Sequence, residues 1–134
     1  MAQEIVYCMG KLMKKALREY KKLNGCLPQM IIFYRDGVGE SQINLIMEVE
    51  VPEIKKAFLS FGEDYKPKFA EITVTKRIDD RFFVNCCKNP QPGTIIPSTV
   101  VSDKFEFFLV AQNVTCGTVT GTKYLVITDN TGLT

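Results

Sequence analysis

The sequence predicts a single α/β domain in which a parallel βαβ unit follows an amphipathic helix and precedes a β-rich segment. Three observations lead to this prediction: helical spacing of apolar residues over positions 4–23, a strand–helix–strand pattern over 28–77, and short β segments after that point. With 134 residues, 46% of them apolar, the chain is long enough for one core and too short for two.

The first predicted element is a helix over residues 4–23. Its apolar side chains recur every three or four positions, and lysines together with Arg18 lie between them. The basic residues gather toward the C-terminal half, where they suit the helix dipole, and Asn24 with Gly25 provides a left-handed stop. We expect the lysines to form a solvated face.

A βαβ unit is predicted next. Residues 28–34 form a continuous apolar run, which is typical of a strand covered on both faces in a parallel sheet. Pro52 and Glu53 begin a second helix that Gly62 ends. Residues 70–77 alternate apolar and polar side chains, as a strand does. This order predicts parallel pairing of the two strands with a right-handed crossover.

The rest of the chain is predicted to be β-rich. A proline-rich and glycine-containing loop occupies residues 89–93, and β segments are expected at residues 94–101, 105–112 and 123–128.

Composition excludes several classes of function. The formal net charge is only +2, so a nucleic-acid partner has to be argued from local features. Histidine is absent, which excludes Ser-His and Cys-His nucleophile pairs and histidine-containing zinc sites within this chain. Five cysteines and no secretory leader favour a reducing compartment, without a disulfide-linked partner. No apolar run approaches the roughly 20 residues that span a bilayer, so a soluble protein is expected.

Polar groups follow both strands of the predicted βαβ unit. Asp36 ends the first strand and precedes Gly37. It is therefore either an ordinary turn-forming residue or a carboxylate ligand for a divalent metal. Lys76 and Arg77 end the second strand, and because parallel strands end at the same edge, they should lie near Asp36. They are either a solvated strand end or contacts to a phosphate backbone. One carboxylate cannot by itself hold two mutually repelling metal ions.

Eight short stretches occur together in one order along the chain, and they resemble the Piwi domain of Argonaute proteins, specifically of the Piwi clade. The stretches are IIFYRDGVG (31–39), VEVPEI (49–54), ITVTKR (72–77), RFF (81–83), NPQPGT (89–94), FFLVAQ (107–112), GTV (117–119) and DNTGL (129–133). Together they cover most of the chain from about residue 28 onward.

The resemblance implies a partial ribonuclease H-like fold, with residues 1–134 as a partial Piwi domain whose first strands and C-terminal end are missing. It implies Mg²⁺ as the cofactor and Asp36 as a catalytic metal ligand, the other catalytic groups lying outside this sequence. Lys76, Arg77 and Gln112 are implied RNA-binding residues, although glutamine is also ordinary at a strand end.

The function that the resemblance implies is a fragment of a piRNA-guided endoribonuclease that cleaves complementary transcripts in transposon silencing. Its partners would be a piRNA guide, a target RNA and silencing-pathway proteins, with no membrane. The cytoplasm, including germ granules, is the expected location, with the nucleus as the alternative. Two other functions stay open: a non-cleaving guide-binding module that recruits silencing partners, and an inactive truncated product.

Other conspicuous residues have ordinary explanations. Phe82 and Phe83 could stack on bases, but core packing is the stronger expectation. Cys86 and Cys87 are adjacent, lack the spacing of a zinc knuckle and are expected to be free thiols in a loop. The acidic pairs at 63–64 and 79–80 are expected to be surface charge, and Lys123 stands where the family usually has histidine.

Overall fold

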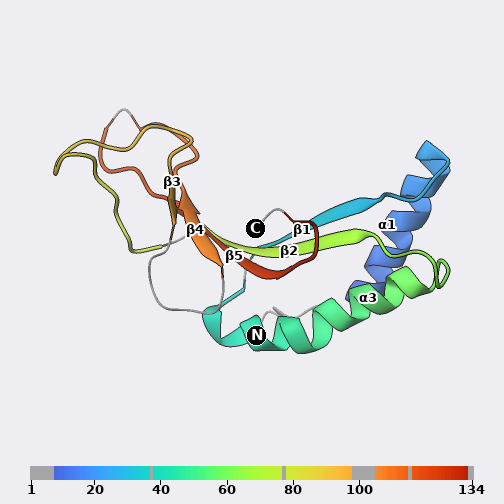
Figure 1. The fold of residues 1–134 in the computed structure, drawn as a ribbon. Coiled ribbons are helices and arrows are strands. Elements are labelled where there is room, and N and C mark those ends of the chain that lie inside the picture. The colour runs from blue at the N-terminus through green and yellow to red at the C-terminus, as the bar shows by residue number, and fades with distance from the viewer. Residues whose placement is uncertain (1–7, 37, 77, 98–104, 115, 133–134) are drawn as a thin grey trace.

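The computed structural model describes residues 8–36, 38–76, 78–97, 105–114 and 116–132. Over these residues the chain forms one five-stranded mixed sheet, with helices on one of its faces (Figure 1). The strand order is β1-β2-β5-β4-β3, with bounds β1 Met30–Asp36, β2 Lys68–Thr75, β3 Ile95–Pro97, β4 Glu106–Leu109 and β5 Thr122–Asp129. The predicted succession of helix, βαβ unit and β-rich segment is confirmed.

Helix α1 spans Met9–Asn24, and its apolar side buries Met9, Met13 and Leu17. Gly25 follows it in the left-handed region at φ 75°, and its N–H donates to the carbonyl of Lys21 at 2.8 Å. The predicted glycine stop is therefore confirmed. Most of the basic side chains between the apolar positions are exposed, as expected for a solvated face.

The connection from β1 to β2 is more helical than the sequence predicts. A 3₁₀ turn (Glu40–Gln42), the short helix α2 (Ile43–Leu45) and a π-helical segment (Ile46–Glu50) lead without a break into α3, Val51–Leu59. The predicted helix start at Pro52 lies within one residue of the start of α3 at Val51, but the helical segments before α3 were not predicted. Pro52 lies in the first turn of α3, where its missing N–H costs little, and the π segment changes the hydrogen-bond register just before it.

Strands β1 and β2 pair in parallel, as predicted, with Phe33 beside Glu71 and Arg35 beside Thr73. Alternate residues of β1 face the helical layer, where Ile31 and Phe33 pack against the cluster that joins α1, α3 and β2. Buried members of this cluster are Met9, Met13, Leu17, Ile54, Ala57, Phe58 and Phe69.

The expectation that β1 is covered on both faces was wrong for the described residues. Its burial alternates, and Ile32 and Tyr34 are 39% and 59% exposed. They alternate with Ile31 and Phe33, which pack against the helical layer, so they lie on the opposite face, which carries no described helix. The continuous apolar run therefore supplies one core face and one open apolar face.

Strand β2 shows the opposite of the usual polar-outward pattern. Its polar residues Glu71 and Thr73 face the helices and are 0% and 5% exposed, whereas Ile72 and Val74 lie half-buried on the open face. β2 is flanked by β1 and by antiparallel β5, with a register shift between Glu71 and Ile72. The helical face of the sheet thus contains charged groups at its centre.

The β-rich half is antiparallel, with β4 between β5 and β3. The ring of Phe82 packs on that of Phe108 at 5.1 Å, and a Cβ at Gly121 would come within 3.1 Å of the same ring. Phe83 is 49% exposed, so the expected core packing is wrong for that residue. Cys86 and Cys87 are exposed free thiols in a turn, as predicted.

Among the residues that the structure describes, no helix is both long enough and apolar enough to cross a bilayer.

Candidate functional site at the end of strand β1

Asp36 and Lys76 meet where the two parallel strands end. Asp36 is the last residue of β1, Lys76 comes directly after β2, and the Lys76 ammonium donates to Asp36 Oδ2 at 2.6 Å. Both side chains are largely exposed, at 54% and 68%. The hydrogen bond to Asp36 and its negative charge raise the pKa of Lys76 above its ordinary value. The predicted proximity of these two residues is confirmed.

The Asp36–Lys76 pair opens onto the helix-free face of the sheet. A cavity of about 460 Å³ lies there, between strands β1, β2, β5 and β4. Its walls are aliphatic and aromatic, and the rings of Phe107 and Tyr124 stack at 5.1 Å with an interplanar angle of 6°. The lining residues are Tyr34, Asp36, Ile72, Val74, Lys76, Phe107, Leu109 and Tyr124. One carboxylate and one ammonium therefore lie beside an apolar surface.

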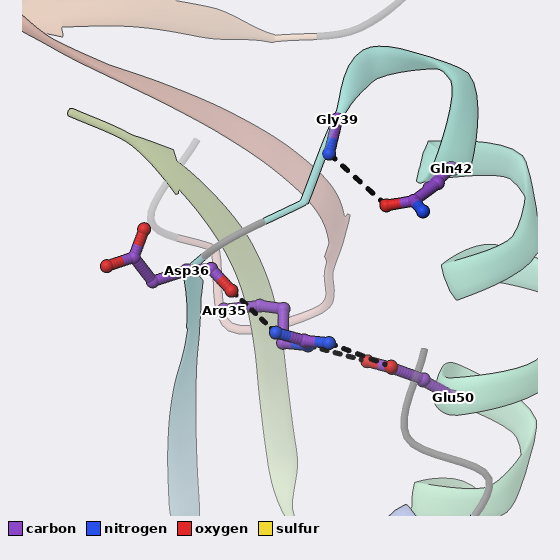
Figure 2. Close-up of polar contacts among 5 residues, drawn as sticks. All are labelled: Arg35, Asp36, Gly39, Gln42 and Glu50. Carbon is purple, nitrogen blue, oxygen red and sulfur yellow. Dashed lines mark hydrogen bonds and ion pairs between the residues drawn. The ribbon is translucent and has the colours of Figure 1, made fainter. Parts of the chain in front are cut away.

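A buried ion pair lies on the other side of β1, directly behind Asp36. Arg35 points toward the helical layer, because successive strand residues face opposite sides, and its guanidinium meets the Glu50 carboxylate of the π-helical segment (Figure 2). Nε donates to Oε2 at 3.1 Å and Nη2 donates to Oε1 at 3.3 Å. The side chains of Glu50 and Arg35 are 0% and 14% exposed, so this bidentate ion pair is shielded from water.

The same guanidinium reaches the site residue itself. Arg35 Nη1 donates to the backbone carbonyl of Asp36 at 2.5 Å, while the Asp36 carboxylate points away from Glu50 (Figure 2). Just beyond, the N–H of Gly39 donates to Gln42 Oε1 at 3.3 Å, which ties the turn after β1 to the start of the helical crossover.

Glu71 is a second fully buried carboxyl in this layer. Neither of its oxygens has a hydrogen-bond partner among the described residues. The pKa of Glu71 is raised from 4.5 to about 7, chiefly by burial and then by the negative charge of Glu50, while the positive charge of Arg35 opposes both. The carboxyl groups of Glu50 and Glu71 thus both interact electrostatically with the Arg35 guanidinium.

The remaining predicted site residues are not brought to Asp36. Arg77 lies outside the described residues. Gln112 is exposed in the segment after β4, and the cavity beside Asp36 is lined by other residues. Asp79 and Asp80 are exposed, as expected for surface charge, and Lys123 pairs with Glu106 at 3.1 Å.

The donor set is suited to one part of a magnesium site. Asp36 offers an exposed carboxylate of the kind that Mg²⁺ prefers, and no group of three or more acidic, cysteine or histidine side chains suited to a metal occurs among the described residues. A cation at Asp36 would have to displace the Lys76 ammonium, a small cost for an exposed pair. The released ammonium could then bind a phosphate.

Sequence reasoning missed Arg35, Glu50 and Glu71. The available signal was a glutamate between two valines before Pro52. Glu50 is charged between two valines, and a charge buried among apolar neighbours is usually paired, whereas Glu71 occupies an ordinary polar position of an alternating strand.

Comparison with known proteins gives the family. A family model described as the Piwi domain matches residues 1–134. Over 98% of this chain, Piwi-like protein 1 of Danio rerio is 41% identical and Piwi-like protein Ago3 of Bombyx mori is 40% identical. The chain covers only 16% and 15% of those relatives.

Solved structures agree with the sequence matches. The crystal structure of Drosophila Piwi superposes with a TM-score of 0.82 at 36% identity, covering 92% of this chain and 18% of that one. The structure of Kluyveromyces polysporus Argonaute with a guide RNA gives 0.82 at 28% identity, over 99% and 18% of the two chains. The C-terminal lobe of a budding yeast Argonaute gives 0.84 at 29% identity, over 97% and 30%.

These matches confirm the expected ribonuclease H-like architecture and the likeness to Piwi-clade proteins. That residues 1–134 are only part of a Piwi domain stays a prediction. The chain belongs to the Piwi-domain family of Argonaute and Piwi proteins.

Proposed function

We propose that this chain supplies one metal-binding carboxylate and one phosphate-binding cation to a piRNA-guided endoribonuclease of the Piwi clade. The observation that carries the proposal is the exposed Asp36 carboxylate at the carboxyl end of β1, with the Lys76 ammonium 2.6 Å away. Ligands of α/β sheets collect at this edge of parallel strands.

Asp36 would hold Mg²⁺ together with groups from outside the described residues. When bound, such a metal supplies an activated water and stabilises the leaving oxygen of the cleaved phosphodiester. Lys76, released from Asp36, would bind a backbone phosphate of guide or target, and Arg77 is proposed as a second phosphate contact. Gln112 is proposed only as a peripheral RNA contact, because it does not line the cavity.

The Argonaute of Kluyveromyces polysporus was solved with a guide RNA, and its fold superposes on 99% of this chain. This similarity supports an RNA ligand here as well. The similarity to Piwi-like proteins favours a piRNA as that guide, with silencing-pathway proteins as further partners. We propose a cytoplasmic, germ-granule location with the nucleus as the alternative; imaging of the tagged full-length protein tests it.

The test is cleavage of a guide-complementary RNA by the full-length protein in Mg²⁺. Asp36→Ala should abolish cleavage and leave guide binding within about twofold of wild type, because Asp36 lies beyond the buried core. The matched control is Asp64→Asn, which neutralises an exposed carboxylate in a turn and should cleave normally. Cleavage by Asp36→Ala at the wild-type rate would refute the assignment.

A second candidate is a guide-binding module that does not cut. It is favoured by the presence of a single suitable carboxylate at the described site, already paired with an ammonium. Guide binding without cleavage in the wild-type protein, at any Mg²⁺ concentration, would select this candidate. Failure of the full-length protein to bind a guide would instead favour an inactive product.

A further inference from the structure

The environment of Arg35 differs from that of an ordinary ion-paired arginine, because its three guanidinium nitrogens serve two different elements. Nε and Nη2 are taken by the buried Glu50 carboxylate, and Nη1 donates to the Asp36 carbonyl (Figure 2). The planar fork of arginine makes these three bonds at once with little freedom to rotate.

Glu50 holds the Arg35 guanidinium from the helical layer. Its carboxylate is fully buried, and its backbone belongs to a π-helical segment continuous with α3, whose side chains pack in the core. An ion pair shielded in this way resists separation, because either charge alone would be left buried without its partner. The anchor of Arg35 is therefore part of the rigid body of the domain.

The carbonyl of Asp36 lies at the point where β1 ends. Asp36 is the last residue of β1, and its pairing with Val74 is the last one in the register that the structure describes between β1 and β2. The Arg35 guanidinium, as a hydrogen-bond donor to this carbonyl, fixes the backbone orientation of Asp36. It thereby fixes the direction in which the Asp36 carboxylate projects from the opposite face of the sheet. The Lys76 contact on the opposite face is exposed, and an exposed ion pair orients a carboxylate only weakly.

We propose that Arg35, anchored by Glu50, is a positioning residue that fixes the Asp36 carboxylate for metal binding. The inference rests on the proposed function, in which Asp36 is a metal ligand. It assigns to the buried pair a role beyond stability: the pair transmits the rigidity of the helical layer through β1 to the exposed site. Groups that orient a metal ligand typically change metal affinity by 10–100-fold when removed.

The test is Mn²⁺ binding to the full-length protein without RNA, measured by water-proton relaxation, with the site defined as the one lost in Asp36→Ala. Arg35→Lys keeps the buried charge for Glu50, but a lysine ammonium cannot also span to the Asp36 carbonyl. We expect the dissociation constant for Mn²⁺ at this site to rise about tenfold or more. The Mg²⁺ concentration for half-maximal cleavage should rise in parallel, with partial recovery at high Mg²⁺.

The matched control is Arg81→Lys. Arg81 also donates to backbone carbonyls, those of Ile78 and Asp80 at 2.8 and 3.0 Å, but it is exposed and distant from this ion pair in the chain. Its Mn²⁺ affinity should stay at the wild-type value. If Arg35→Lys does not fold, the double variant Arg35→Gln/Glu50→Gln removes both buried charges together and should show the same loss of affinity.

The outcomes separate the two proposals. Unchanged Mn²⁺ binding in Asp36→Ala would refute the proposed function itself. Loss in Asp36→Ala, with folded Arg35→Lys binding Mn²⁺ within twofold of wild type, would overturn only the positioning role of Arg35.

Discussion

The buried carboxyl of Glu71 should make the stability of this domain depend on pH. In the folded protein its pKa is raised from 4.5 to about 7, chiefly because burial removes it from water. The folded state therefore keeps a proton that the unfolded chain loses, and stability falls as the pH rises from about 4.5 to about 7. A difference of this size corresponds to about 3 kcal/mol, lost progressively across that window.

The variant that tests this is Glu71→Met, which keeps an unbranched side chain of similar length and removes the titrating group. Urea unfolding of wild type and variant between pH 4.5 and pH 8 gives the difference in free energy of unfolding at each pH. We expect this difference to grow in favour of the variant by about 3 kcal/mol across the window and to level off above it. Other carboxylates titrate in both proteins and cancel in the comparison.

Glu63→Gln is the control, since Glu63 is exposed and its removal should leave the pH profile parallel to that of wild type. Parallel profiles for Glu71→Met and wild type would overturn the prediction, because they would mean that Glu71 titrates alike in the folded and unfolded states.

Two further predictions concern the RNA contact and the core. Lys76→Gln in the full-length protein should weaken binding of a guide–target duplex and lower the slope of log affinity against log salt by about 1, measured by filter binding. Lys55→Gln, an exposed change on α3, is its control, and an unchanged slope in Lys76→Gln would contradict the phosphate contact. Ile54→Ala should cost about 2–5 kcal/mol in urea unfolding, because Ile54 is 0% exposed between α1 and the sheet. Leu59→Ala, 57% exposed, should cost far less, and equal losses would contradict the described core.

Local patterns in the sequence were sufficient for much of the fold. The helical spacing before Gly25 defined α1, and the two apolar segments around the crossover defined β1 and β2. These signals work because each depends on neighbours within a few residues. Parallel pairing then placed Asp36 and Lys76 at one edge, and the 2.6 Å contact between them follows from it.

The features that failed depend on contacts distant in sequence. Pro52 has the local signature of a helix start and lies in the first turn of α3, but nothing local indicates that the π-helical segment extends the helical path before it. Arg35 and Glu50 are 15 residues apart and meet through packing of the crossover on the sheet. Glu71 looks like an ordinary polar position of an alternating strand, and its burial is decided by the face on which the helices pack.

The most direct test of the proposed metal binding at Asp36 is an anomalous-diffraction map of the full-length protein, loaded with guide RNA and soaked in Mn²⁺. We predict a peak about 2.1 Å from a carboxylate oxygen of Asp36, with the Lys76 ammonium moved from Asp36 to a phosphate. A cleavage-competent complex in which Lys76 still holds Asp36, and the metal binds elsewhere, would contradict the proposed role of both residues.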